Sequence, residues 1–121
     1  MCTFLAACGG GPAIEYRFAD AVNACETLEW STARADLLES GDTAQASQYA
    51  SGRCFMVEPA RPVTIVDEQG GLFRGDDRFV LVETTDGEPL EHHAGAEFRE
   101  AVGQPARTSG WVRLSDLVEL P

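Results

Sequence analysis

The sequence predicts an α+β domain, mainly β, in which an N-terminal helical hairpin precedes a series of short antiparallel strands. Apolar residues recur at helical spacing before Arg53 and alternate with a period of two after it. The 121 residues suit a single domain. A hydrophobic fraction of 44% excludes wholesale disorder.

Residues 13–53 are expected to form the helical part. Ala13 to Phe18 is apolar and aromatic enough for a short strand or an extended lead-in. The spacing of Ala, Val and Leu predicts helix over 19–28, and Ser31 is expected to cap a second helix over 32–40.

A Gly-Asp pair separates this helix from the next one. Gly41 is suited to the left-handed residue that ends a helix, and Asp42 is suited to cap the helix that follows. We therefore expect a helix from Thr43 to about Ser51, ended by Gly52.

Residues 54–121 are expected to be β-rich. Thr85-Asp86-Gly87 is a hairpin-turn signal, Gln69-Gly70-Gly71 is a second turn, and residues 115–117 suggest a 3₁₀ turn. Residues 88–108 are the least regular segment, with one or two helical turns expected between Ala96 and Val102. The predicted strands are 54–58, 63–67, 78–84, 110–114 and 118–120.

Part of this segment resembles the bacterial SH3-like (SH3b-type) barrel. The resemblance rests on Val63-Thr-Ile-Val-Asp67, on Asp86-Gly87, on Gly110-Trp111-Val112 and on the turn at 115–117, and it covers about half of the chain. The family joins its D-G and G-W-V motifs by a few residues, so the resemblance implies a small antiparallel barrel with an insertion at about 88–108. Such domains bind through variable loops, so no binding residue transfers.

The N-terminus contains a lipoprotein-type signal. Leu5-Ala6-Ala7-Cys8 matches a lipobox and is followed by a Gly run, which predicts lipidation of Cys8 and makes 1–12 a truncated signal and linker. No Lys or Arg precedes Cys8 and the apolar stretch is short, so export would require a start upstream of Met1. The alternative is a chance string on a cytoplasmic protein.

The cysteines follow from this address. Cys2 would leave with the signal and Cys8 would carry lipid, which leaves Cys25 and Cys54 to pair in an oxidising compartment. Such a disulfide would add about 3.5 kcal/mol in the loop-entropy model. The alternative is two buried free thiols in a cytosolic protein. No C-x-x-C motif occurs, so no metal is expected.

The charge limits the partners. Twenty acidic residues against nine basic ones give a net charge of −11, which repels nucleic acid and anionic lipid. We expect no nucleic-acid binding and no membrane contact except through a lipid on Cys8.

Four places are candidate binding residues, each with a simpler interpretation. His92 and His93 are adjacent and therefore point in different directions, which favours an exposed loop over joint action. Arg74-Gly75-Asp76 spells an adhesion tripeptide in a turn, and Asp76-Asp77 is an acidic rim without an EF-hand pattern. Trp111 could stack on a sugar or peptide if partly exposed, but suits a barrel core.

No catalytic motif or cofactor motif is found. The sequence therefore predicts a non-catalytic bacterial lipoprotein on the periplasmic side of the cell envelope. It would bind a protein or peptide through barrel loops around 68–77 and 88–108. The alternative is a cytosolic acidic inhibitor or nucleic-acid mimic of a basic protein, and a hydrolase using His92 or His93 is the least favoured class.

Overall fold

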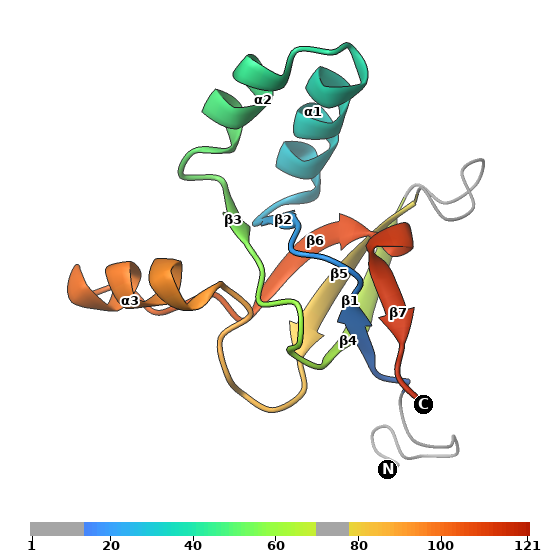
Figure 1. Ribbon diagram of the computed structural model, residues 1–121, viewed down its shortest axis with the longest axis vertical. Coiled ribbons are helices and arrows are strands. Elements are labelled where there is room, and N and C mark those ends of the chain that lie inside the picture. Colours follow the sequence, from blue (N-terminus) through green and yellow to red (C-terminus); the bar gives the residue numbers. More distant parts are fainter. Residues whose placement is uncertain (1–13, 70–77) are drawn as a thin grey trace.

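The strands of the protein form one antiparallel sheet that curls into an open half-barrel (Figure 1). The computed structural model describes residues 14–69 and 78–121. The strand order across the sheet is β3-β2-β6-β5-β4-β1-β7. The strands are β1 (Tyr16–Phe18), β2 (Asn23–Cys25), β3 (Cys54–Met56), β4 (Val63–Gln69), β5 (Phe79–Thr84), β6 (Ser109–Arg113) and β7 (Leu117–Glu119).

Two helical segments leave this sheet between neighbouring strands (Figure 1). Helices α1 (Leu28–Glu39) and α2 (Thr43–Ala50) form a hairpin between β2 and β3, and α3 (His93–Ala101) lies between β5 and β6. A 3₁₀ turn at Leu114–Asp116 precedes β7. The α+β class and the barrel-like sheet are confirmed, but helix and strand are about equal, so the expected predominance of β is not observed.

The predicted helix over 19–28 is wrong, because this segment contains β2. Ala24 and Cys25 are fully buried, and Cys25 pairs with Cys54 of β3 on one side and Trp111 of β6 on the other. Pairing on both sides satisfies the backbone and buries small side chains, which outweighs the weak helical spacing of the segment.

The first helix begins earlier than predicted. Thr27 is its N-cap, with Oγ1 accepting a hydrogen bond from Trp30 N at 3.1 Å. Ser31, the predicted cap, lies inside the helix and is buried, and its hydroxyl donates to the Trp111 carbonyl at 3.1 Å. A hydroxyl residue with a tertiary partner does not need to end a helix.

The punctuation between α1 and α2 is confirmed. Gly41 has φ of 85° in the left-handed region, and Asp42 Oδ1 accepts a hydrogen bond from Gln45 N at 3.1 Å. The second helix ends at Ala50, as the sequence predicts within one residue.

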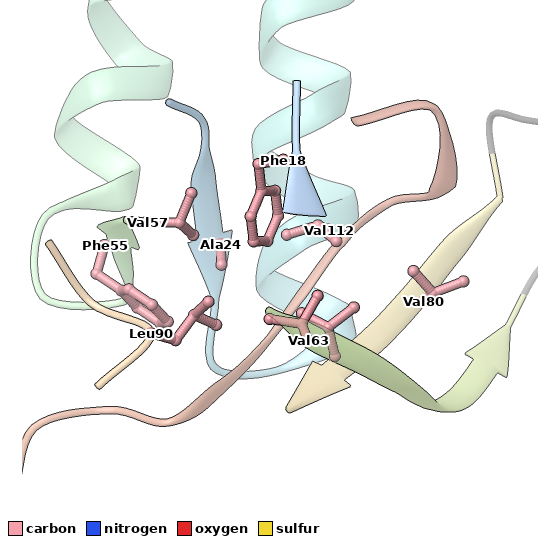
Figure 2. Close-up of a cluster of buried hydrophobic side chains, with 9 residues drawn as sticks. Phe18, Ala24, Phe55, Val57, Val63, Val80, Leu90 and Val112 are labelled. Atoms are coloured by element: carbon pink, nitrogen blue, oxygen red, sulfur yellow. The ribbon is translucent and has the colours of Figure 1, made fainter. Parts of the chain in front are cut away.

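The core lies on the concave side of the sheet and is entirely apolar (Figure 2). Three valines from β4 and β5 have no exposed surface, and Leu90 reaches the same cluster from the segment before α3. The cluster consists of Phe18, Ala24, Phe55, Val57, Val63, Val80, Val82, Leu90 and Val112.

Gly110 of β6 allows a close approach beneath this core. A Cβ at this position would lie 2.8 Å from the Ala24 Cβ and 3.0 Å from the Phe55 ring. No side chain fits there without movement of β2 or β3.

The predicted disulfide is present. Cys25 and Cys54 are register partners on β2 and β3 with a Cα–Cα distance of 3.9 Å, and they are joined at the base of the helical hairpin. The bond closes the 29-residue separation that contains both helices.

The segment 88–108 is more regular than expected. Gly87 has φ of 78°, and Asp86 Oδ1 accepts from Glu88 N at 3.0 Å, but the chain then departs instead of forming a tight hairpin. Leu90 N donates to the Arg107 carbonyl at 2.8 Å, which closes the neck of the excursion. The helix that follows starts at His93, three residues before the predicted position.

A charge network fixes α3 to the sheet. Glu91 is 6% exposed, and its Oε2 lies 3.4 Å from a terminal guanidinium nitrogen of Arg107, while its Oε1 lies 3.6 Å from Arg99 Nε. The Arg107 guanidinium also pairs with Glu26, just after β2, and lies 5.0 Å from the Phe55 ring centroid. This network links the neck of α3 to the base of the hairpin.

Candidate functional site

The candidate site is a cleft between the helical hairpin and the sheet, where two cavities of about 310 and 340 Å³ adjoin. We call it the hairpin cleft. The two cavities share Asn23, Arg34 and Leu38, so they meet at one face of α1. In Figure 1 the hairpin lies above β2, β3 and β6, which provide the opposite side of the cleft.

The helix face explains why space remains there. Ser31, Arg34, Ala35 and Leu38 follow the i, i+3, i+4, i+7 spacing that places residues on one side of a helix. Two of the four are small, and they bring α1 close to β6 without filling the volume beside it. The opposite wall of the first cavity comes mainly from Val22, Phe79, Trp111, Val112, Arg113 and Asp116.

Arg34 is the cation at the junction of the two cavities. It is partly buried, and among the residues that the structure describes it forms no hydrogen bond and no ion pair. Burial lowers the pKa of Arg34, the charge of Asp116 raises it, and the charge of Arg113 lowers it again. The guanidinium therefore lies in a site that desolvates it without supplying a direct acceptor.

Asp116 provides the opposite charge in the first cavity. Burial raises the pKa of this carboxyl group, and a backbone hydrogen bond and charge from Arg113, together with the charge of Arg34, lower it. Arg113 is engaged elsewhere as well, with Glu39 at 3.8 Å and the Phe79 ring centroid at 5.7 Å. A donor group and an acceptor group thus line one cavity whose remaining walls are largely apolar.

The second cavity extends the cleft towards the edge of the sheet. Ala46 and Ala50 of α2 line it together with Met56 of β3. Leu38 is 39% exposed and Met56 is 42% exposed, so two large apolar side chains remain accessible at its rim. The hairpin cleft therefore combines apolar surface with one cation that lacks a direct partner.

Trp111 is a wall of this cleft and not an exposed platform. It is 9% exposed, and its carbonyl accepts the hydrogen bond from Ser31. The proposed role in stacking required partial exposure of the ring, and this condition is not met in the folded chain.

The two histidines lie on a different element. His92 caps α3, with Nδ1 accepting from Ala94 N at 3.4 Å, and His93 Nε2 lies 3.1 Å from Glu97 Oε2. Both are exposed and they make separate local contacts, which places them at a helix start and not in a loop. The structure does not bring either into the hairpin cleft.

Several predicted site residues lie outside the described residues. These are Cys8, with the lipobox around it, and Arg74, Asp76 and Asp77. The sequence interpretation missed Arg34, Leu38, Met56 and Asp116. A charged residue at an inward helical position, between Ser31 and Ala35 on one side and Leu38 on the other, was the available signal.

Over residues 14–69 and 78–121, no group of three or more His, Cys, Asp or Glu side chains is placed to hold a metal ion. The helices in those ranges are too short or too polar to cross a bilayer. No protein-family model matches the chain, and searches of curated proteins and of solved structures also found no match.

Proposed function

We propose that this chain is a non-catalytic binding module of the bacterial cell envelope, with an SH3-like barrel as its scaffold and a protein or peptide as its partner. The observation that carries the proposal is the hairpin cleft, in which apolar side chains surround an Arg that forms no direct ion pair in the described part of the chain. Binding sites commonly combine mostly apolar walls with a few placed polar groups.

The envelope address rests on two features that agree. The lipobox predicts a lipid on Cys8, on the periplasmic side, and a Cys25–Cys54 disulfide is typical of an oxidising compartment. Fractionation of the native host, with the gene and its upstream DNA, should place the wild-type protein in the membrane fraction. The Cys8→Ser variant should become soluble, and an equal distribution of both would reject the anchor.

The binding surface can be mapped by photocrosslinking in the host. We would place a photoreactive residue at Leu38 or Met56, in the cleft, and at Val118 on β7 as a control. The three side chains are matched, with 39%, 42% and 37% exposure. We expect the same discrete adduct from both cleft positions and none from Val118. No adduct at either cleft position, or equal adducts at all three, would reject the cleft as the binding surface.

The loops predicted from the sequence provide a further position for the same experiment. Residues 70–77 lie outside the described part, but 88–108 carries Phe98 on α3, with 69% exposure. An adduct from Phe98 alone would move recognition from the cleft to this segment, as the barrel resemblance predicts.

The acidic-inhibitor alternative is favoured by a different surface. A hollow beside α3 is lined by five glutamates, Glu58, Glu88, Glu91, Glu97 and Glu100, so the negative charge is concentrated there. Such a face suits a basic groove, and its binding would weaken steeply with salt. Binding to a basic partner that is unchanged from low to high salt would reject this function.

A further inference from the structure

The hairpin cleft also indicates what kind of group it would bind, and this inference rests on the proposed binding function. The guanidinium of Arg34 has no hydrogen-bond acceptor among the described residues, yet it lies in a cavity shared with the Asp116 carboxylate. The two groups are not in direct contact as an ion pair, although each influences the titration of the other. A small group placed between them could contact both.

We propose that the cleft binds the C-terminal end of a peptide, with the terminal carboxylate on Arg34, the last backbone N–H on Asp116 and a medium-sized apolar side chain between α1 and β6.

The charges favour this class of ligand. A carboxylate can accept two parallel hydrogen bonds from a guanidinium, which is the strongest contact available to an unpaired Arg. Asp116 can only accept hydrogen bonds when ionised, so its counterpart on the ligand must be a donor. A peptide end carries a carboxylate and an N–H on the same residue, which supplies both.

The shape of the cavity fits the third element. Val22, Ala35 and Val112 line it together with the Trp111 ring, and its volume is about 310 Å³. This is at the small end of the range for ligand cavities and suits one or two residues. A highly charged anion is disfavoured, because Asp116 lines the same cavity in a protein with net charge −11.

The same chemistry occurs in a free amino acid, so the test uses three probes on the full chain with its disulfide intact. N-acetyl-L-leucine represents the peptide end, and N-acetyl-L-leucinamide lacks only the carboxylate charge. L-leucine replaces the amide N–H with an ammonium group. Each would be titrated into the ¹⁵N-labelled protein, with backbone shifts of α1 and β6 as the readout.

We expect N-acetyl-L-leucine to shift residues around Arg34 and Trp111 in a saturable way, and N-acetyl-L-leucinamide to bind about tenfold more weakly or not at all. Arg34→Gln should lower affinity for the acid by about tenfold or more and remove the difference between acid and amide. Arg61→Gln is the control, because it removes one positive charge without lining the cleft.

Asp116→Asn separates the two ligand sources. It retains an oxygen acceptor, so affinity for N-acetyl-L-leucine should be unchanged or higher, whereas binding of the L-leucine ammonium group should weaken. Tighter binding of L-leucine than of the acetylated probe would reject the peptide end and identify a free amino acid. Equal shifts from acid and amide, or an equal loss in Arg61→Gln, would overturn the carboxylate site.

The proposed function and this inference can fail separately. A cleft adduct in cells together with no binding of the three probes would preserve the binding module and reject the carboxylate chemistry.

Discussion

The two helical excursions from the sheet are closed in different ways. The α1–α2 hairpin leaves and re-enters between β2 and β3, and the Cys25–Cys54 disulfide joins its two ends. The α3 excursion leaves and re-enters between β5 and β6, and its neck is held by backbone hydrogen bonds and by Glu91 between two arginines. One closure is covalent and the other is ionic.

The difference teaches which conditions each excursion depends on. A disulfide is insensitive to salt but requires an oxidising environment. A buried ion pair is insensitive to redox potential, but each partner left alone becomes an unpaired charge in a desolvated site. Each closure can be broken while the other is left intact.

The largest expected effect comes from the covalent closure. The double variant Cys25→Ser/Cys54→Ser should lower the free energy of unfolding by about 3–4 kcal/mol, because the 29-residue loop is no longer restricted in the unfolded chain. Urea unfolding measures this loss. Hydrogen exchange should accelerate in α1 and α2 but not in α3. A reductant should reproduce the loss in the wild type and have no effect on the variant.

The ionic closure should give the next largest effect. Glu91→Gln leaves Arg99 and Arg107 without their buried counter-charge, and both have limited side-chain exposure of 20% and 13%. We expect a loss of about 2–3 kcal/mol, with faster exchange in α3 and little change in the hairpin.

The matched control is Glu97→Gln on the same helix, whose side chain is 66% exposed and pairs only with His93. It should change stability by less than about 0.5 kcal/mol. Equal losses from the two substitutions would contradict a special role for the buried network.

Gly110→Ala should weaken both excursions at once. The new methyl group would meet Ala24 just before the hairpin and Phe55 just after it, and Phe55 lies against Arg107 at the neck of α3. Displacing β2 or β3 costs about 1–3 kcal/mol, which thermal unfolding can measure. Exchange that accelerates in only one of the two excursions would show that they are not coupled through this position.

Arg34→Met should be close to neutral, which separates a binding role from a structural one. The substitution removes a partly desolvated cation that makes no direct ion pair or hydrogen bond with the described residues. We expect a change within about 0.5 kcal/mol or a gain in stability by urea unfolding. A loss above about 1.5 kcal/mol would mean that Arg34 supports the hairpin and is not held for a ligand.

The smallest effect concerns pH. Burial raises the pKa of Asp116, so its proton is bound more tightly in the folded than in the unfolded state. That contribution is complete below the unfolded pKa and is lost as pH rises through the higher folded pKa. Asp116→Asn cannot titrate, so its stability relative to wild type should increase from about pH 3 to about pH 7, by less than about 0.5 kcal/mol. A relative decrease over this interval would reverse the sign of the shift.

Local signals in the sequence predicted the elements with strong punctuation. The Gly41-Asp42 pair marks the break between helices, and alternation marks the strands from Val63 onward. Prediction failed at residues 19–28, where the backbone pairs with strands that are distant in sequence. Local spacing carries no information on such partners, and the strand order β3-β2-β6 is equally invisible to it.

The candidate site was harder to predict for the same reason. The disulfide pairing followed from an even number of remaining cysteines, but Arg34 and Asp116 are far apart in sequence and come together only when α1 packs on β6. The sequence did show an Arg on an otherwise small and apolar helix face. It did not show that no partner would face it.

The position of the hairpin has a consequence for how this chain could be built from simpler parts. No residue between Cys25 and Cys54 belongs to the apolar cluster that holds the sheet together. The two strand ends that it joins already lie side by side, 3.9 Å apart at their Cα atoms. A short reverse turn could therefore span the same gap, so the hairpin is a replaceable cassette: segments of other lengths and surfaces can be exchanged there without disturbing the framework that carries them.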